Sequence, residues 1–297
     1  MSGKFDIPFK SKVVPAILEE GARIKFRCHK EISCFNACCR NADITLTPYD
    51  VIRLKQRLGT SSAEVLREHS VPFEMDNHGL PGIKMKTTDS GACLLMQEGE
   101  GCTVYEDRPT ACRYYPVAML AMKPSDEPTE RHAYSLVKEA HCKGHDEEVE
   151  QTVDEYRRAQ GVADYDEINR DFYQLILKKK STGPAVGRPS DTSLQLFFMA
   201  CYDIDRFKKF ALSGAFRAAY NLDASVFEQI ETDDVFALQF SMAFLKQVLF
   251  GEKTIEEQEG AWEKRVTERK EIWELRRQAE IARDEQRNEE LMREVES

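Results

Sequence analysis

The sequence predicts an α+β fold, in which an irregular cysteine-rich domain with short strands and helices precedes an α-helical region and a long charged C-terminal helix. Three observations predict it. Turn residues surround short apolar pieces up to about residue 145, helical apolar periodicity follows, and more than half of residues 252–297 are charged. We therefore divide the chain into a cysteine-rich domain over 1–145, a helical region over 146–251 and a charged helical tail over 252–297.

Two short helices and a strand are expected in the first segment. Residues 47–50, Thr-Pro-Tyr-Asp, supply a capping box with proline at the first helical position, and Gly59 stops the helix that follows. Residues 61–64, Ser-Ser-Ala-Glu, repeat the capping box. The alternation of residues 82–86, Gly-Ile-Lys-Met-Lys, predicts a strand.

Two helical faces open the second segment. The first holds Val149, Val153 and Tyr156 and ends at Gly161. The second consists of four apolar residues at helical spacing: Tyr165, Ile168, Phe172 and Leu175.

A break and further helices complete the second segment. Residues 181–190 hold two glycines and two prolines, which is typical of a loop or linker. Apolar helices are expected around 194–216 and over 235–250.

The charged tail has few apolar positions, and these are Trp262, Val266, Trp273, Leu275, Leu291 and Val295. No heptad pattern of apolar residues continues through three repeats, so a solvated helix is expected rather than a coiled coil. A protein partner that binds this helix is the alternative, with Trp262 and Trp273 as anchors.

Charge and hydropathy exclude two classes of partner. The formal net charge of -10 disfavours nucleic acid. No stretch approaches about 18 uncharged apolar residues, which disfavours a membrane span. The first residues lack the apolar core of a signal peptide, and we expect a cytoplasmic protein.

The cysteines carry the strongest functional signal. Eight of the nine lie between residues 28 and 142, and these are Cys28, Cys34, Cys38, Cys39, Cys93, Cys102, Cys112 and Cys142. A reducing compartment disfavours disulfides, so thiolate metal binding or redox chemistry is the leading interpretation. Cys201 follows the apolar run 196–199 and is interpreted as an ordinary buried thiol.

The number of residues between successive cysteines helps to decide which metal they bind. Structural zinc sites use pairs of ligands two to four residues apart, and among these gaps only that from Cys34 to Cys38 qualifies. The adjacent Cys38 and Cys39 diverge along the backbone and suit two centres, or two irons of one cluster. Eight thiolates fit two four-sulfur sites, or one [4Fe-4S] cluster with four cysteines in other roles. An iron–sulfur cluster is preferred over zinc, and a purely redox or disulfide role stays open.

The order of the motifs resembles the YkgJ family of cysteine-cluster proteins, whose zinc- or iron-chelating domain has a CxxCxxCC start. The resemblance runs from Cys28 to Gly144 and includes a Cys-x-x-Tyr at 102–105 and an Arg-Pro-x-x-Cys-Arg-x-Tyr-Pro block at 108–116. It implies iron–sulfur or zinc binding. The first cluster departs from the family, because five residues separate Cys28 from Cys34 where the usual pattern has two.

The wider first cluster is distantly similar to that of flagellin lysine methylases, which implies transfer of a methyl group from S-adenosylmethionine as an alternative function. The residues lend it little support, because no Gly-rich strand-to-helix turn is found and Asn41 stands where a radical S-adenosylmethionine triad needs its third cysteine. Three functions therefore stay open: an iron–sulfur protein in redox or electron-transfer chemistry, a protein lysine methyltransferase, and a zinc-stabilised interaction module.

Arginines and histidines flank the cysteines. Arg108 and Arg113 surround Cys112 and are candidates for cofactor binding, through contacts to sulfur or nearby carbonyls. Salt bridges to Glu106 and Asp107 are the alternative. The tyrosines Tyr105, Tyr114 and Tyr115 are interpreted as core or lid residues, and the histidines His29, His141 and His145 as residues that face away from a metal.

Overall fold

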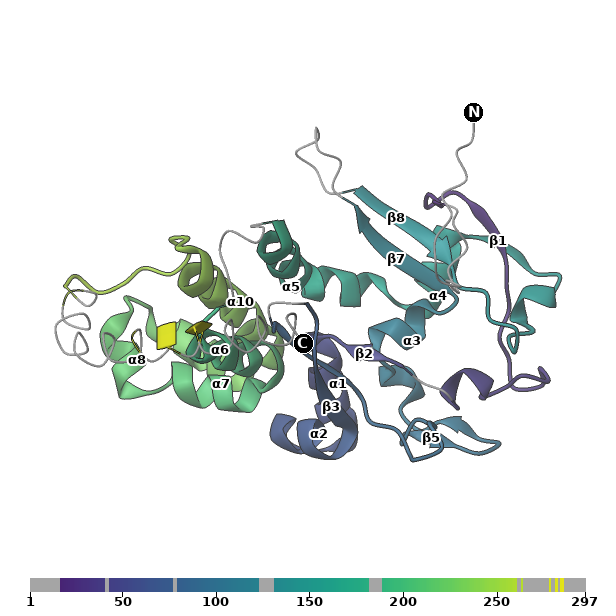
Figure 1. Ribbon diagram of the computed structural model, residues 1–297, viewed down its shortest axis with the longest axis horizontal. Helices are drawn as coiled ribbons and strands as arrows, with labels where there is room; N and C mark the ends of the chain where they lie inside the picture. The colour runs from purple at the N-terminus through teal and green to yellow at the C-terminus, as the bar shows by residue number, and fades with distance from the viewer. Residues whose placement is uncertain are drawn as a thin grey trace. The chain divides into compact units, whose positions relative to one another are not determined.

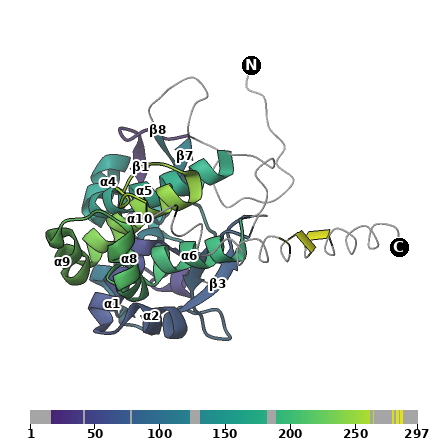
Figure 2. The ribbon, with the colours of Figure 1, turned by 90° about the vertical axis from the view of Figure 1, so that its left-hand side faces the viewer.

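The computed structural model describes residues 17–40, 43–76, 79–122, 131–181 and 189–260, with isolated residues from 263 to 285. Helices and short strands are combined, which confirms the predicted α+β class (Figures 1 and 2). The contacts divide the chain into unit 1, Met1–Ser181, and unit 2, Thr182–Ser297. Unit 1 therefore takes in the helices that follow the last clustered cysteine.

One end of unit 1 holds the locally predicted elements, which are α1 (Pro48–Leu58), α2 (Ser62–His69), β2 (Thr45–Leu46), β3 (Ser70–Glu74) and β4 (Pro81–Met85). The strands form an antiparallel sheet in the order β2-β4-β3. Both predicted capping boxes are present, from Thr47 to Asp50 and from Ser61 to Glu64. Gly59 ends α1 with a φ of 64°, a left-handed conformation that glycine adopts readily.

The opposite end of unit 1 is built from strands distant in sequence (Figures 1 and 2). β1 (Arg23–Lys25) pairs with β9 (Glu150–Thr152), and β7 (Val117–Met122) pairs with β8 (Arg131–Leu136), both antiparallel. A core cluster joins them, made of Ile24, Phe26, Tyr114, Val117, Tyr134, Val153, Tyr156 and Val162. This core fixes the ends of the cysteine-bearing loops.

Unit 1 also has six short elements, of which η1, β6 and α3 carry cysteines. The six are the 3₁₀ turns η1 (Ala37–Cys39), η2 (Tyr105–Asp107) and η3 (Gly144–Asp146), the strands β5 (Met96–Gln97) and β6 (Gly101–Cys102), and the helix α3 (Thr110–Tyr114). α3 contacts β2 at one end of the unit and β7 and α4 at the other. Its single cysteine, Cys112, is thereby held in the middle of unit 1.

Two helices complete unit 1. α4 (Val153–Gln160) ends at Gly161 as predicted, and α5 (Ala163–Ser181) buries Tyr165, Phe172 and Leu175. The placement of Val149 in the first helix was wrong. Its carbonyl accepts a hydrogen bond from Phe26, because the pairing of β9 with β1 draws this stretch into extended structure.

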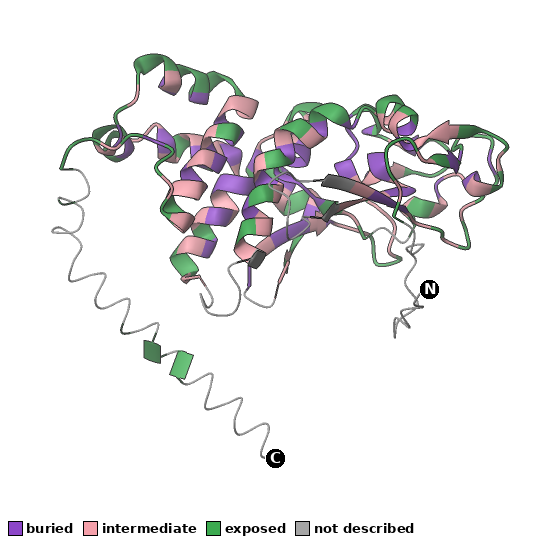
Figure 3. Ribbon diagram, turned by 90° about the horizontal axis from the view of Figure 1, so that it is seen from above, coloured by how far each residue is buried: buried purple, intermediate pink, exposed green. Residues whose placement is uncertain are grey.

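Unit 2 is helical and consists of α6 (Asp191–Tyr202), α7 (Ile204–Ala211), α8 (Gly214–Ala219), α9 (Ala224–Thr232) and α10 (Asp234–Phe250). The helix expected around 194–216 is three helices, because Asp203 and Ser213 each cap the start of a new one. Phe216 and Phe244 pack with ring centroids 5.6 Å apart. Figure 3 shows the buried residues (purple) that alternate with exposed ones (green) along these helices.

Cys201 in α6 is buried, with 1% of its surface exposed, as predicted. Residues 252–260 are not helical, which corrects the start of the predicted tail helix. Gly251 ends α10, and Glu257 then forms a β-bridge with Tyr220. Most of the predicted tail helix after residue 260 lies outside the described residues, as do Trp262, Trp273 and the loop at 182–188. The described helices include none that is long and apolar enough to cross a membrane.

Candidate metal centre

Eight of the cysteines lie in unit 1, and four of them fall within residues 28–39. All are free thiols, and they are Cys28, Cys34, Cys38, Cys39, Cys93, Cys102, Cys112 and Cys142. Cys28 and Cys38 are exposed, and the other six are partly buried. The eight therefore lie at and just below the surface rather than in a core.

Backbone hydrogen bonds hold these segments together. The amide of Cys93 donates to the carbonyl of Cys39 over 2.8 Å, and the amide of Lys143 donates to the sulfur of Cys34 over 3.2 Å. At Gly144 the chain passes so close to β1 that an added Cβ would lie 2.5 Å from the ring of Phe26. A glycine after the last cysteine is thus required by packing.

Cys28 is the centre of a first thiol group, made of Cys28, Cys34, Cys38 and Cys142. The pKa of Cys28 is raised to about 11, first by the partial burial of its sulfur and then by the negative charges of the other three. The other three sulfurs are therefore close enough to Cys28 for their charges to oppose its ionisation.

Cys112 is the centre of a second thiol group, made of Cys39, Cys93, Cys102 and Cys112. Burial raises the pKa of Cys112, and the charges of Cys93 and Cys102 raise it further. The pKa of Cys39 is raised by the thiol of Cys38, by burial, and by the charges of Cys112 and Cys93.

The adjacent Cys38 and Cys39 join the two groups. Their sulfurs lie 3.9 Å apart, and the hydrogen bond from Cys39 lowers the pKa of Cys38 to about 7. The charge of Cys38 also acts on Cys93, Cys102 and Cys112. Cys38 is therefore near enough to its neighbour and to both groups to influence each of them.

The eight thiols lie near one another but are not arranged around a common metal position. Within the described ranges, no group of three His, Cys, Asp or Glu side chains is arranged to hold a metal ion. The donor chemistry nevertheless suits a soft cation, because thiolates bind zinc and iron and because a coordinating cation removes the mutual repulsion that opposes ionisation here. Metal binding would therefore draw the sulfurs together, as is usual where binding and folding are coupled.

Arg108 lies beside both thiol groups. Burial raises the pKa of Cys28 and Cys102, and the guanidinium of Arg108 acts in the opposite direction on each. The guanidinium donates to the carbonyl of Tyr105 and to Gln160, both over 2.7 Å, and stacks 4.1 Å from the centre of the Tyr105 ring. It is thus a fixed positive charge next to the cysteines.

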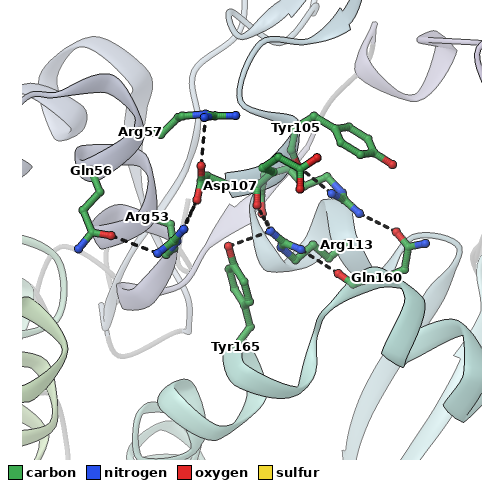
Figure 4. Close-up of polar contacts among 10 residues, drawn as sticks. Arg53, Gln56, Arg57, Tyr105, Asp107, Arg113, Gln160 and Tyr165 are labelled. Carbon is green, nitrogen blue, oxygen red and sulfur yellow. Dashed lines mark hydrogen bonds and ion pairs between the residues drawn. The ribbon is translucent and has the colours of Figure 1, made fainter.

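Arg113 is buried and bonds to the protein frame (Figure 4). It donates to the carbonyls of Glu106, Arg108 and Gln160, the last over 2.8 Å, and to the hydroxyl of Tyr165 over 3.1 Å. These contacts tie the loop before α3 to α4 and α5. Contacts to nearby carbonyls were among those expected of Arg113, and none of these bonds reaches a sulfur or an acidic side chain.

The alternative prediction, salt bridges from Arg108 and Arg113 to Glu106 and Asp107, does not hold at Asp107. Asp107 pairs with Arg53 and Arg57 of α1 rather than with Arg108 or Arg113 (Figure 4). These three residues are far apart in sequence and belong to no motif, so no local pattern indicated the pairing.

Asp50 has a second role beyond its predicted cap. It is fully buried, and its Oδ1 accepts from the amide of Thr110 over 2.8 Å and from its hydroxyl over 2.7 Å, while Oδ2 accepts from the amide of Thr47. The start of α1 is thereby bonded to the start of the helix that carries Cys112.

The three nearby histidines have protein partners. His29 lies 3.5 Å from a carboxylate oxygen of Glu147, and His141 lies 3.6 Å from one of Glu139. His145 is 3.2 Å from the carbonyl of Val137. In this arrangement, each of the three imidazole rings lies next to a carboxylate or a carbonyl group.

One region of the chain matches a family model. Residues 27–143 match the CxxCxxCC family model, described as "Putative zinc- or iron-chelating domain". The match spans the eight clustered cysteines, from Cys28 to Cys142. No curated protein and no solved structure matches the chain significantly.

Proposed function

We propose, from the membership of residues 27–143 in the CxxCxxCC family, that this chain is an iron–sulfur protein that exchanges electrons through centres ligated by the two thiol groups. The matched model describes residues 27–143 as a zinc- or iron-chelating domain, which supports binding of a metal by the cysteines.

The observation that carries the proposal is the division of the thiols at Cys38 and Cys39. The group around Cys28 and the group around Cys112 contain four cysteines each, and four sulfurs are what one [4Fe-4S] cluster or one tetrahedral metal site requires. Because the paired thiols are adjacent in η1, the two centres would share one short segment of backbone.

Two features favour iron over zinc. The sulfurs come from residues 28–39, 93–102, 112 and 142 rather than from two paired knuckles, and iron–sulfur clusters accept ligands from widely separated segments. The exposure of Cys28 and Cys38 would bring the first centre to the surface, where electrons can pass to a partner. An iron–sulfur cluster supplies one-electron redox chemistry when bound.

Two groups of the chain would stabilise the negative charge of such centres. The amide of Lys143 donates to Cys34, and amide hydrogen bonds to thiolate sulfur stabilise its negative charge. Arg108 adds a positive charge next to Cys28 and Cys102. Both groups would orient and stabilise thiolates without binding metal themselves.

The test is anaerobic purification of the full chain, followed by iron, acid-labile sulfide and zinc analysis and a visible spectrum. Iron with equal sulfide, and a visible absorbance that bleaches on reduction by dithionite, are expected. Zinc without sulfide would overturn the iron–sulfur assignment in favour of a zinc-stabilised module. Folded protein without metal, with all eight thiols freely titratable, would overturn metal binding altogether.

A further inference from the structure

Asn36 has an unusual backbone conformation in the middle of the first run of cysteines. Its φ is 65°, and within the described ranges it is the one residue other than glycine with a positive φ. This left-handed region is costly for residues that have a Cβ, although asparagine adopts it more readily than most. Such conformations persist where the surrounding structure holds them, and they concentrate at functional sites. Asn36 is also buried, with 7% of its surface exposed.

The backbone of Asn36 completes a tight turn between two clustered cysteines. The amide of Ala37 donates to the carbonyl of Cys34 over 2.9 Å, which closes a β-turn over residues 34–37. The φ of 65° and ψ of -1° at Asn36 match the third position of a type II turn, which requires glycine or asparagine. The carbonyl of Asn36 then accepts from the amide of Cys39 over 3.0 Å and begins η1. The turn therefore fixes how the chain passes from Cys34 to Cys38.

The side chain of Asn36 connects this turn to the hairpin of β5 and β6. Its Nδ2 donates to the carbonyl of Gln97 over 3.4 Å. Gln97 pairs with Gly101, where an added Cβ would lie 3.1 Å from the ring of Phe35 and 3.8 Å from Oδ1 of Asn36. Gly101 directly precedes Cys102 in β6. The turn is thus packed against a strand that carries a cysteine of the second thiol group.

We infer that Asn36 is a positioning residue for metal binding, whose left-handed backbone orients Cys34 and Cys38 and whose side-chain amide holds the β5–β6 hairpin. This inference rests on the proposed function. Asn36 acts through the cysteines on either side of it and through the hairpin that carries Cys102. Because a metal must draw the thiols together, a turn that is already formed reduces the ordering that accompanies binding.

The backbone is expected to contribute more than the amide. The hydrogen bond to Gln97 is longer than the usual 2.7–3.2 Å, so its loss should have a small effect. Alanine at position 36 loses this bond and must also adopt a left-handed conformation. Glycine loses the bond but adopts the conformation without a steric cost. The two substitutions therefore separate the contributions of side chain and backbone.

A general loss of stability is the competing explanation, and Gly59→Ala is the matched control for it. Gly59 has a φ of 64°, lies in unit 1 and follows α1, which carries no cysteine. A Cβ added there would meet nothing within 4 Å. Alanine at Gly59 thus imposes the same backbone cost as alanine at Asn36, in a segment without thiols.

The experiment compares Asn36→Ala, Asn36→Gly and Gly59→Ala with the wild type as anaerobically purified full-length protein. Metal content, circular dichroism, the midpoint of urea unfolding and the rate of metal release to a chelator are measured. Asn36→Gly should release metal about two- to threefold faster than the wild type. Asn36→Ala should release it roughly fivefold or more faster than Asn36→Gly, which is the equilibrium cost of a left-handed alanine. Gly59→Ala should lower the unfolding midpoint and leave the release rate unchanged.

Three outcomes would overturn the inference. Wild-type release from Asn36→Gly would show that the amide holds no ligand segment in place. Release from Asn36→Ala that is no faster than from Asn36→Gly would show that the left-handed backbone does not orient the cysteines. Equal acceleration in Gly59→Ala and Asn36→Ala would show a general loss of stability. If Asn36→Ala does not fold, the release rate of Asn36→Gly decides by the first criterion.

The wild-type protein separates this inference from the proposed function. Wild type without metal would overturn both together. Wild type with zinc would overturn only the iron–sulfur assignment, because the comparison of release rates applies to either metal.

Discussion

Asp50 of α1 accepts two hydrogen bonds from Thr110 of α3, one from the amide and one from the hydroxyl. The same carboxylate caps α1 through Thr47. One buried side chain thus joins a helix that forms locally to the short helix that carries Cys112. The stability of α1 and the position of a candidate ligand are thereby coupled.

Asp50→Ala is expected to lower both stability and metal retention. It leaves two buried amides and a hydroxyl without an acceptor, which costs about 3 kcal/mol in free energy of unfolding. Urea denaturation and metal analysis measure the two effects. Glu64→Ala is the control, because Glu64 occupies the same capping position in α2 but is exposed and distant from the thiols. Equal metal loss in both variants would contradict the coupling.

The division into two thiol groups predicts partial loss of metal. Cys34→Ser and Cys112→Ser are each expected to lose about half of the bound metal, because each removes a ligand from one centre only. The double variant should lose nearly all of it. Cys201→Ser should retain the wild-type content, since Cys201 lies in the core of unit 2.

Other patterns of loss would decide against this division. If either single substitution removed all the metal, a single centre would be indicated. If Cys201→Ser lost as much metal as Cys112→Ser, the assignment of ligands to unit 1 would be wrong. Cys38→Ser is expected to have the largest effect of the eight, because its charge acts on both groups.

The sequence predicted what depends on neighbouring residues. The capping boxes at Thr47 and Ser61 and the glycine stops at Gly59 and Gly161 are confirmed, because each is satisfied within one turn of its own helix. The eight cysteines were identified as a set for a similar reason, since their concentration in one half of the chain is visible without a fold.

The sequence did not predict what depends on pairing over long distances. β1 pairs Arg23 with Thr152, and although its charged and apolar residues alternate, nothing in the sequence near Ile24 indicates a partner strand more than a hundred residues away. The division of the thiols depends on such pairings too, because the hydrogen bond from Cys93 to Cys39 crosses more than fifty residues. Asp107 and its partners Arg53 and Arg57 were missed because nothing local links them.

The two arginines next to α3 are expected to differ in effect. Arg113→Lys keeps the charge but cannot reproduce the fork of bonds to three carbonyls, and it should lose about 2 kcal/mol of stability with little change in the spectrum of the folded protein. Arg108→Gln should instead speed metal release, because it removes the positive charge beside Cys28 and Cys102. Thermal melts measure the loss of stability, and release of metal to a chelator measures the effect on the centre. If Arg108→Gln lost stability and Arg113→Lys released metal faster, the roles assigned to the two arginines would be the wrong way round.

Removal of the metal is expected to loosen unit 1 before unit 2. The segments that carry Cys28 to Cys39 and Cys93 to Cys102 are held by short turns and single backbone bonds, whereas unit 2 has a continuous aromatic core. Regions with few buried contacts open first. Limited proteolysis of chelator-treated protein should cut within residues 28–40 or 86–103, and first cuts in α6 or α10 would contradict this order.

The start of the charged tail is expected to stabilise unit 2. Ile255 is buried, its amide donates to Gln247 over 2.8 Å, and the hydroxyl of Thr254 donates to the carbonyl of Ala243 over 2.7 Å. Truncation after Gly251 removes these contacts and the β-bridge of Glu257, and it should cost about 2 kcal/mol. Truncation after Gly260 keeps them all and should leave stability unchanged.

Both truncations are expected to leave metal content and spectrum unchanged, because the candidate ligands lie in unit 1. The comparison also tests whether the tail binds a protein partner. If it does, pull-down of a partner should be lost equally in both truncations, since both remove Trp262 and Trp273. Loss of metal on either truncation would show that residues beyond 251 complete the centre, and the assignment of metal binding to unit 1 alone would then be wrong.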